Sequence, residues 1–148
     1  MRSNQLHDLM EMFTYHYKIW SLEWSKNNDL GISTTCVTIL NILVNEGSKQ
    51  AKDLVTALFI TSGGVTGVTN RLVKAGLILR KRDEEGDRRS INFEITDKGR
   101  EVLALANVRR SELMEKFYRS LTDGDVKKLY QIYNKMHYDV QDDDFQVY

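Results

Sequence analysis

The sequence predicts a mainly α-helical protein with one small β-hairpin, in the order ααααββαα. Two observations lead to this fold class. Apolar residues recur every three or four positions in six segments, which is the period of an α-helix, and two short β-type runs flank a charged turn near residues 80–90. With 148 residues and 41% apolar content, the chain is long enough for one compact domain with a helical extension.

Four helices are expected in the first half of the chain. Apolar and aromatic residues at helical spacing predict the first helix at residues 4–26. Ser33, Ser48 and Thr61 are suited to begin the next three helices, because a side-chain oxygen there accepts a hydrogen bond from an otherwise unpaired backbone N–H. Gly76 is expected to end the fourth helix in the left-handed conformation. The side chains expected to face the core from these three helices are Cys36, Ile39, Leu40, Leu43, Ala51, Leu54, Val55, Leu58, Val65, Val68, Leu72 and Ala75.

Two strands and two further helices are expected in the second half. Residues 77–79 form the first strand, and apolar side chains alternate along residues 91–95, which predicts the returning strand. A fifth helix begins at Thr96 or Asp97 and continues to about Arg119.

A capping box formed by Thr122 and Asp125 is expected to open the sixth helix. The first helix and the last two carry apolar stripes wider than one small module covers. Packing against a second copy of the chain would bury this surplus, which predicts a homodimer whose dimerisation region is residues 1–30 and 97–148. A monomeric bundle is the alternative.

Charge is unevenly distributed, although the chain as a whole is neutral. Residues 49–89 hold nine basic residues against five acidic ones, whereas the last ten residues hold four aspartates and no basic residue. A basic middle segment in a neutral chain favours an anionic partner such as nucleic acid.

Nothing in the sequence indicates export, membrane insertion or enzymatic chemistry. The N-terminal segment lacks the pattern of a signal peptide, and no apolar run approaches the roughly 20 residues that span a bilayer. The single cysteine, Cys36, suits a reducing compartment, so a cytoplasmic location is expected. Because no phosphate loop, metalloprotease motif or nucleophile elbow occurs, we expect neither an enzyme nor a bound cofactor or metal.

Residues 60–103 contain a set of motifs in a fixed order. They are Ile60-Thr61, Val65-Thr66, Arg71-Leu72, Gly76-Leu77-Ile78, Asp87-Arg88-Arg89 and Ile95-Thr96-Asp97-Lys98-Gly99. This order resembles the winged helix-turn-helix of the MarR family of bacterial transcription regulators. The resemblance covers nearly the whole chain and implies one MarR-type domain, residues 1–148, in which residues 33–96 bind DNA. A homodimeric regulator, expected to be a repressor, would then bind a pseudo-palindromic duplex site.

The fourth helix, residues 61–75, is the expected recognition helix, which enters the major groove with its solvent-facing side. Asn70 is suited to bond adenine edges, and the methyl group of Thr66 is suited to contact thymine. Gly63 and Gly67 each cost about 1 kcal/mol in a helix interior, so they either permit close approach to DNA or mark an irregular helix start. The residues expected on the DNA-facing side are Ser62, Gly63, Thr66, Gly67, Asn70, Arg71 and Lys74.

Residues 80–92 are the expected wing. The family resemblance implies that Arg89 enters the minor groove, that Asp87 orients its guanidinium, and that Arg88 reaches a neighbouring phosphate. A narrow A·T-rich minor groove has a strong negative potential, which favours such a cation. A solvated hairpin tip is the alternative. Further contacts to the DNA backbone are expected from Lys49, Lys52, Lys81 and Arg82.

A sensing site is a further expectation. Many regulators of this family release DNA when a small aromatic anion binds between the dimer helices and the winged module. The first helix lies near where such a pocket would be, and it contains the candidate pocket residues Tyr15, His16, Trp20 and Trp24. Packing in the core or in the dimer contact is the alternative role of these aromatic residues. The alternative ways of sensing are oxidation of Cys36 and metal binding by His137, Asp139 and residues 142–144, with His7 and His16 approaching from the first helix of either subunit. The rival to DNA binding is a winged helix that binds a protein.

Overall fold

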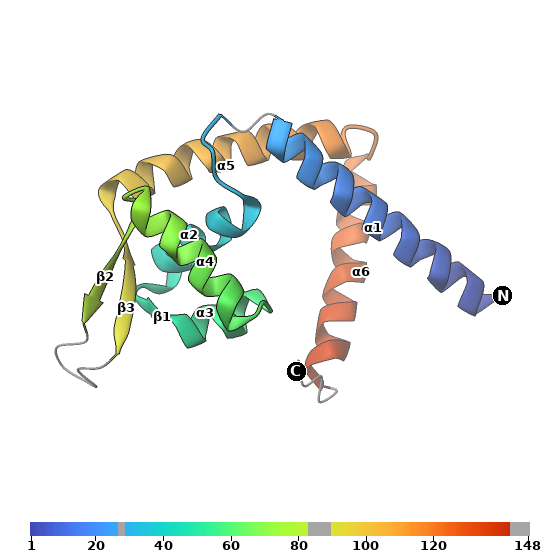
Figure 1. The fold of residues 1–148 in the computed structure, drawn as a ribbon. Coiled ribbons are helices and arrows are strands. Elements are labelled where there is room, and N and C mark those ends of the chain that lie inside the picture. Colours follow the sequence, from blue (N-terminus) through green and yellow to red (C-terminus); the bar gives the residue numbers. More distant parts are fainter. Residues whose placement is uncertain (27–28, 83–89, 143–148) are drawn as a thin grey trace. The chain divides into compact units, whose positions relative to one another are not determined.

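The computed structural model describes residues 1–26, 29–82 and 90–142, with side chains as far as residue 136. Its elements are α1 (Arg2–Lys26), α2 (Thr34–Glu46), β1 (Lys49–Gln50), α3 (Ala51–Leu58), α4 (Ser62–Lys74), β2 (Ile78–Arg82), β3 (Ile91–Ile95), α5 (Asp97–Tyr118) and α6 (Asp123–Asp142) (Figure 1). The chain divides into two compact units, residues 1–110 and residues 111–148, and the boundary falls within α5. The predicted class, mainly α with a small β-wing, is confirmed.

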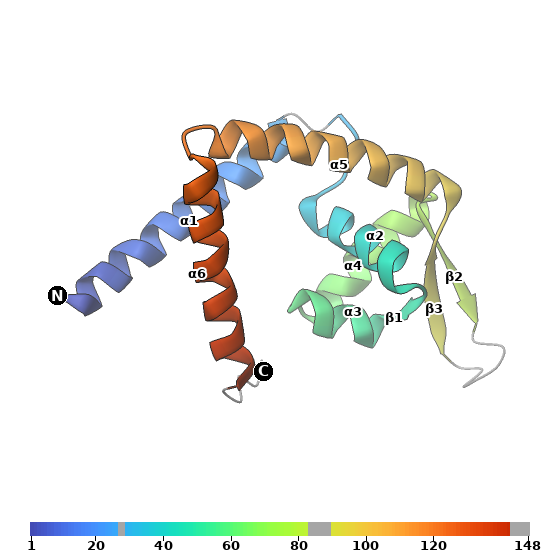
Figure 2. The same cartoon turned by 180° about the vertical axis from the view of Figure 1, so that it is seen from behind.

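The core of the first unit lies between α2, α3, α4 and the sheet. Ile39 and Leu40 of α2, Leu54 of α3 and Val65 of α4 are all 0% exposed. Full burial of such a side chain contributes about 1.5–3 kcal/mol, so this cluster fixes α4 against its neighbours. Figures 1 and 2 show α4 on one side of the module and α2 on the other, with the sheet at one end.

The start of α2 and both ends of α4 are the predicted ones. Ser33 Oγ accepts a hydrogen bond from the backbone N–H of Cys36 (3.3 Å), and Thr61 Oγ1 accepts one from Gly64 (3.1 Å). Gly76 has a φ of +73°, in the left-handed region that favours glycine. Thr61 and Gly76 therefore set where α4 begins and ends through contacts between residues that are close in the sequence.

Two details of the first unit differ from expectation. Ser48 does not begin the third helix, because the next two residues form β1, which pairs with β3 and gives the sheet order β1-β3-β2. The α3 helix begins at Ala51, where Asp53 accepts a hydrogen bond from the backbone N–H of Gln50 (2.8 Å). A two-residue strand has no periodicity for sequence reasoning to detect. Ala51 and Ala75 are exposed because each lies at a helix end and not on a buried face.

The second unit contains the turn into α6. The predicted capping box is confirmed: the backbone N–H of Thr122 donates to Asp125 (3.0 Å), and the backbone N–H of Asp125 donates to Thr122 Oγ1 (3.2 Å). Large apolar side chains stay exposed along α6 in the single chain, by about half or more, namely Val126, Tyr130, Ile132, Tyr133 and Met136. Among the residues that the structure describes, no helix is long and apolar enough to cross a membrane.

Candidate nucleic-acid interface

The α4 helix has two sides of different character. Its buried side consists of Val65, Val68, Thr69 and Leu72. The hydroxyl of Thr69 donates to the carbonyl of Val65 (2.9 Å), so this buried polar group is satisfied within the helix. All seven residues that the sequence assigned to the outer face are exposed: Ser62, Gly63, Thr66, Gly67, Asn70, Arg71 and Lys74. The fold therefore places them together on one solvent-facing surface, called here the outer face of α4.

The charge of this surface is positive. The α4 helix, which the structure describes completely, contains no acidic residue, and it carries Arg71 and Lys74 in its last turns. Three more exposed cations, Arg80, Lys81 and Arg82, follow on β2. A helix face without carboxylates beside a cationic strand suits a polyanionic partner.

Gly63 and Gly67 have no intramolecular contact that requires glycine. A Cβ placed at either residue would meet no atom within 4 Å. The helix is a regular α-helix from Ser62 onwards, so an irregular helix start does not explain them. Because glycine has no side chain, the helix backbone is exposed at these two positions of the outer face.

Asn70 is held by a residue that sequence reasoning missed. Its Oδ1 accepts a hydrogen bond from Nη2 of Arg80 on β2. Arg80 lies opposite Phe93 in the β2–β3 register, and its Cζ stands 5.8 Å from the centroid of the Phe93 ring. Strand alternation puts Arg80 on the same face of β2 as the buried Ile78, and this was the one signal in the sequence for its contact with Phe93, although Arg80 itself is exposed.

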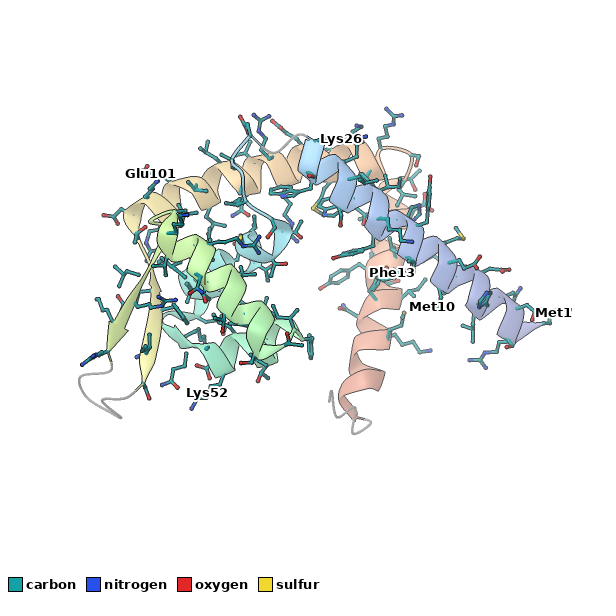
Figure 3. The ribbon with its side chains drawn as sticks, viewed as in Figure 1. Met1, Met10, Phe13, Lys26, Lys52 and Glu101 are labelled. Atoms are coloured by element: carbon teal, nitrogen blue, oxygen red, sulfur yellow. The ribbon has the colours of Figure 1, made fainter. Side chains whose placement is uncertain are left out.

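The remaining basic candidates differ in their surroundings. Lys49 pairs with Glu46 (2.9 Å) and Lys81 pairs with Glu94 (2.7 Å), so part of the charge of each lysine is balanced within the chain. Lys52 is exposed on α3 (Figure 3), and Arg82 is exposed at the end of β2. The predicted wing-tip residues Asp87, Arg88 and Arg89 lie outside the described residues.

The four aromatic candidates for an effector site are not brought together. Trp20 and Trp24 line a pocket of about 130 Å³, whose other lining residues are Thr34, Val37, Thr38 and Arg110. Trp24 is a fixed wall of this pocket, because its Nε1 donates to the carbonyl of Ile32 (3.0 Å). Tyr15 and His16 do not line the pocket, and their rings lie side by side, 6.3 Å apart, on an exposed part of α1.

The order of elements defines the class of protein. A helix-turn-helix formed by α3 and α4 precedes the β2–β3 strands, and the second helix presents a cationic outer face. This is the architecture of a winged helix-turn-helix regulator.

Comparison with known proteins points to the same class of regulator. Residues 30–90 match the model described as MarR family. The uncharacterized HTH-type transcriptional regulator YpoP of Bacillus subtilis is 29% identical over 136 residues, which cover 92% of this chain and 96% of YpoP. The crystal structure of the transcriptional regulator BldR from Sulfolobus solfataricus is 25% identical, with a TM-score of 0.73 over 91% of this chain and 93% of BldR.

A third likeness concerns the fold alone. The crystal structure of the organohalide-sensing regulator RdhR-CbdbA1625 in its 2,4-dichlorophenol-bound form is 17% identical, with a TM-score of 0.83 over 97% of this chain and 86% of that one. Residues 30–90 thus match the MarR family that the motifs predicted, and the likenesses to YpoP and BldR are those of a transcriptional regulator.

Proposed function

We propose that the chain regulates transcription by binding duplex DNA as a homodimer, with α4 in the major groove and the wing, residues 80–92, in the adjacent minor groove. The observation that carries this proposal is the outer face of α4, which is exposed, free of acidic residues and bordered by the cations of β2. The major groove, about 12 Å wide, admits an α-helix. In this proposal Arg71 and Lys74 contact phosphates, Ser62 at the helix N-terminus contacts another phosphate, and Thr66 meets a base edge.

The wing residues have separate roles in this proposal. Arg89 enters the minor groove, Asp87 orients its guanidinium, and Arg88 contacts a neighbouring phosphate. The exposed cations at the base of the wing, Arg80 to Arg82, support this orientation, because they place positive charge along the strand that leads to the tip.

The apolar surface of the terminal helices supports a homodimer. On α1, five apolar side chains on one face are more than half exposed in the single chain: Leu6, Leu9, Met10, Phe13 and Tyr17. Figure 3 shows Met10 and Phe13 on α1. Contiguous apolar faces of this kind are unusual on a soluble monomer. In this proposal residues 1–30 and 97–148 form the dimer, and its twofold axis requires a pseudo-palindromic site with half-sites about one helical turn apart.

A dimer seated across such a site would exclude polymerase from overlapping promoter DNA, so we propose that the chain acts as a repressor. The experiment that tests DNA binding is selection of duplexes from a random pool, followed by footprinting and by measurement of affinity against salt concentration. We expect a steep fall in affinity with salt, because phosphate contacts release counterions. A slope near zero would favour the rival, a winged helix that binds a protein.

We also propose that a small aromatic anion binds in the pocket between Trp20 and Trp24. Two indole rings form apolar walls, and Arg110 supplies a cation at the lining. The volume of about 130 Å³ is close to the roughly 150 Å³ cavity that accommodates benzene in another protein. The 2,4-dichlorophenol bound to RdhR-CbdbA1625 supports an aromatic ligand in this fold.

A further inference from the structure

We infer that Arg80 determines the base preference of Asn70, because its hydrogen bond commits Asn70 to donate to DNA and not to accept from it. This inference rests on the proposed role of the outer face of α4 in DNA binding. Arg80 is then a positioning residue for recognition: it acts through Asn70.

The chemistry of the pair fixes the orientation of the Asn70 amide. An asparagine side chain has one acceptor oxygen and one NH₂ group with two donors, whereas arginine only donates. The atom of Asn70 that faces Nη2 of Arg80 is therefore the oxygen, Oδ1. Asn70 is exposed, so its NH₂ group stays available at the surface.

Arg80 is itself held by the fold. It sits opposite Phe93 in the antiparallel register, and cross-strand neighbours of this kind are in side-chain contact. Phe93 is 5% exposed, and the guanidinium of Arg80 stands over its ring at 5.8 Å, where a cation is attracted by the π-system. The hydrogen bond to Asn70 therefore comes from a side chain that is oriented before any DNA arrives.

The hydrogen bond from Arg80 changes which base edges Asn70 can recognise. Selective adenine reading by asparagine uses both ends of the amide, since Oδ1 accepts from the N6 amino group while Nδ2 donates to N7. Oδ1 has two lone pairs, and the guanidinium of Arg80 occupies one of them. The positive charge and the bulk of the guanidinium disfavour a second donor, the adenine amino group, at the same oxygen. Asn70 is left to donate, which suits guanine with its adjacent acceptors N7 and O6, or thymine O4. Adenine is less suited, because its N7 acceptor lies beside a donating amino group. The adenine contact expected from the sequence is replaced by a preference for these acceptors.

The test compares sites selected from a random duplex pool by the full-length wild type and four variants. Asn70→Ala identifies the base position that Asn70 reads, because the preference there is lost. Arg80→Met removes the donors and keeps an apolar stem over Phe93, and Arg80→Lys keeps a donating cation. Arg82→Met is the matched control, because Arg82 lies on the same face of β2, two residues further along.

We expect the wild type to prefer guanine or thymine at this position. Arg80→Met frees Oδ1 and is expected to shift the preference towards adenine by about tenfold, within the range of a bidentate contact, whereas Arg80→Lys keeps the wild-type preference. Arg82→Met is expected to weaken binding and lower the salt slope by about one without changing the preferred base. A merely structural role of Arg80 would lower affinity and leave the preferred base unchanged.

Two results would overturn the role of Arg80. One is a wild-type preference for adenine at the base position that Asn70→Ala identifies. The other is an unchanged preference in an Arg80→Met protein that melts within a few degrees of the wild type. Absence of salt-dependent DNA binding by the wild type would instead refute the proposed function, and this inference with it.

Discussion

Gly99, in the first turn of α5, lies directly against the carbonyl group of Leu77, so that a Cβ at Gly99 would stand 2.1 Å from the Leu77 oxygen. The same carbonyl accepts a hydrogen bond from the backbone N–H of Thr96 (3.0 Å). In the same turn of α5, Lys98 Nζ donates to the carbonyl of Ala75 (2.9 Å), at the C-terminal end of α4. These contacts connect the start of α5 to the end of the proposed recognition helix, α4.

Gly99→Ala is expected to destabilise the protein. The new methyl group would clash with the backbone of Leu77, and a backbone cannot rotate away as a flexible side chain does. The free energy of unfolding should therefore fall by about 1–3 kcal/mol. Urea unfolding followed by circular dichroism measures this change. Gly124→Ala is the matched control, because the nearest atom to a Cβ there is Thr122 Oγ1 at 3.7 Å. Equal stability of the two variants would show that the Gly99 contact relaxes easily.

Gly63→Ala and Gly67→Ala are expected to have opposite effects on stability and on DNA binding. Each should raise the free energy of unfolding by up to about 1 kcal/mol, because alanine is the better helix former and its Cβ meets nothing within 4 Å. Affinity for the selected site should fall, since the added methyl groups stand on the outer face of α4. Thermal melts and DNA titrations on the same samples measure both quantities. Unchanged affinity would show that the helix backbone does not approach DNA closely at these glycines.

The features that sequence could predict are those made by neighbouring residues. Thr61 capping α4 and Gly76 ending it depend on residues within one turn, and both are confirmed. The link from Arg80 to Asn70 joins two elements, and the contact of Gly99 with Leu77 spans the wing, so neither leaves a local pattern. The side of α4 that faces solvent was predictable from helix periodicity, because the buried side had already been assigned.

Phe13→Asp is expected to convert the proposed homodimer to a monomer. Phe13 lies in the middle of the exposed apolar face of α1, and a carboxylate there would be buried without a partner in the dimer. Sedimentation velocity at micromolar concentration measures the change in mass. Tyr15→Asp is the control, because Tyr15 is similarly exposed but lies on the opposite side of the helix. A wild type that sediments as a monomer, or a Phe13→Asp protein that stays dimeric, would contradict the proposed interface.

Binding of a small aromatic carboxylate is expected to quench the intrinsic tryptophan fluorescence. The chain has two tryptophans, Trp20 and Trp24, and both line the pocket, so the signal reports directly on the site. Titration with benzoate and salicylate should give saturable quenching, and Arg110→Gln should weaken it because the cation at the lining is lost. Cyclohexane carboxylate, which has the same charge without the aromatic ring, is the ligand control. Linear quenching in the wild type, or equal affinity in Arg110→Gln, would count against this pocket.

The capping box of α6 is expected to make part of the stability depend on pH. The hydrogen bond from the Thr122 hydroxyl (2.7 Å), and then the one from the Thr122 backbone N–H, hold the pKa of Asp125 below its usual value of 3.8. A carboxyl group with a lowered pKa in the folded state stabilises the fold fully above its unfolded pKa. That contribution is lost as the pH falls through the lower folded pKa.

Asp125→Asn should therefore lower the free energy of unfolding at pH 7, and the difference from the wild type should shrink below pH 3.8 and disappear in stronger acid. Urea unfolding at a series of pH values, with the two proteins compared at each, isolates this group from the other carboxylates. Asp123→Asn removes the same charge from the same helical turn, so it reports the general attraction of a helix N-terminus for an anion. If both variants show the same pH dependence, the effect belongs to the charge near the helix end and not to the hydrogen bonds with Thr122.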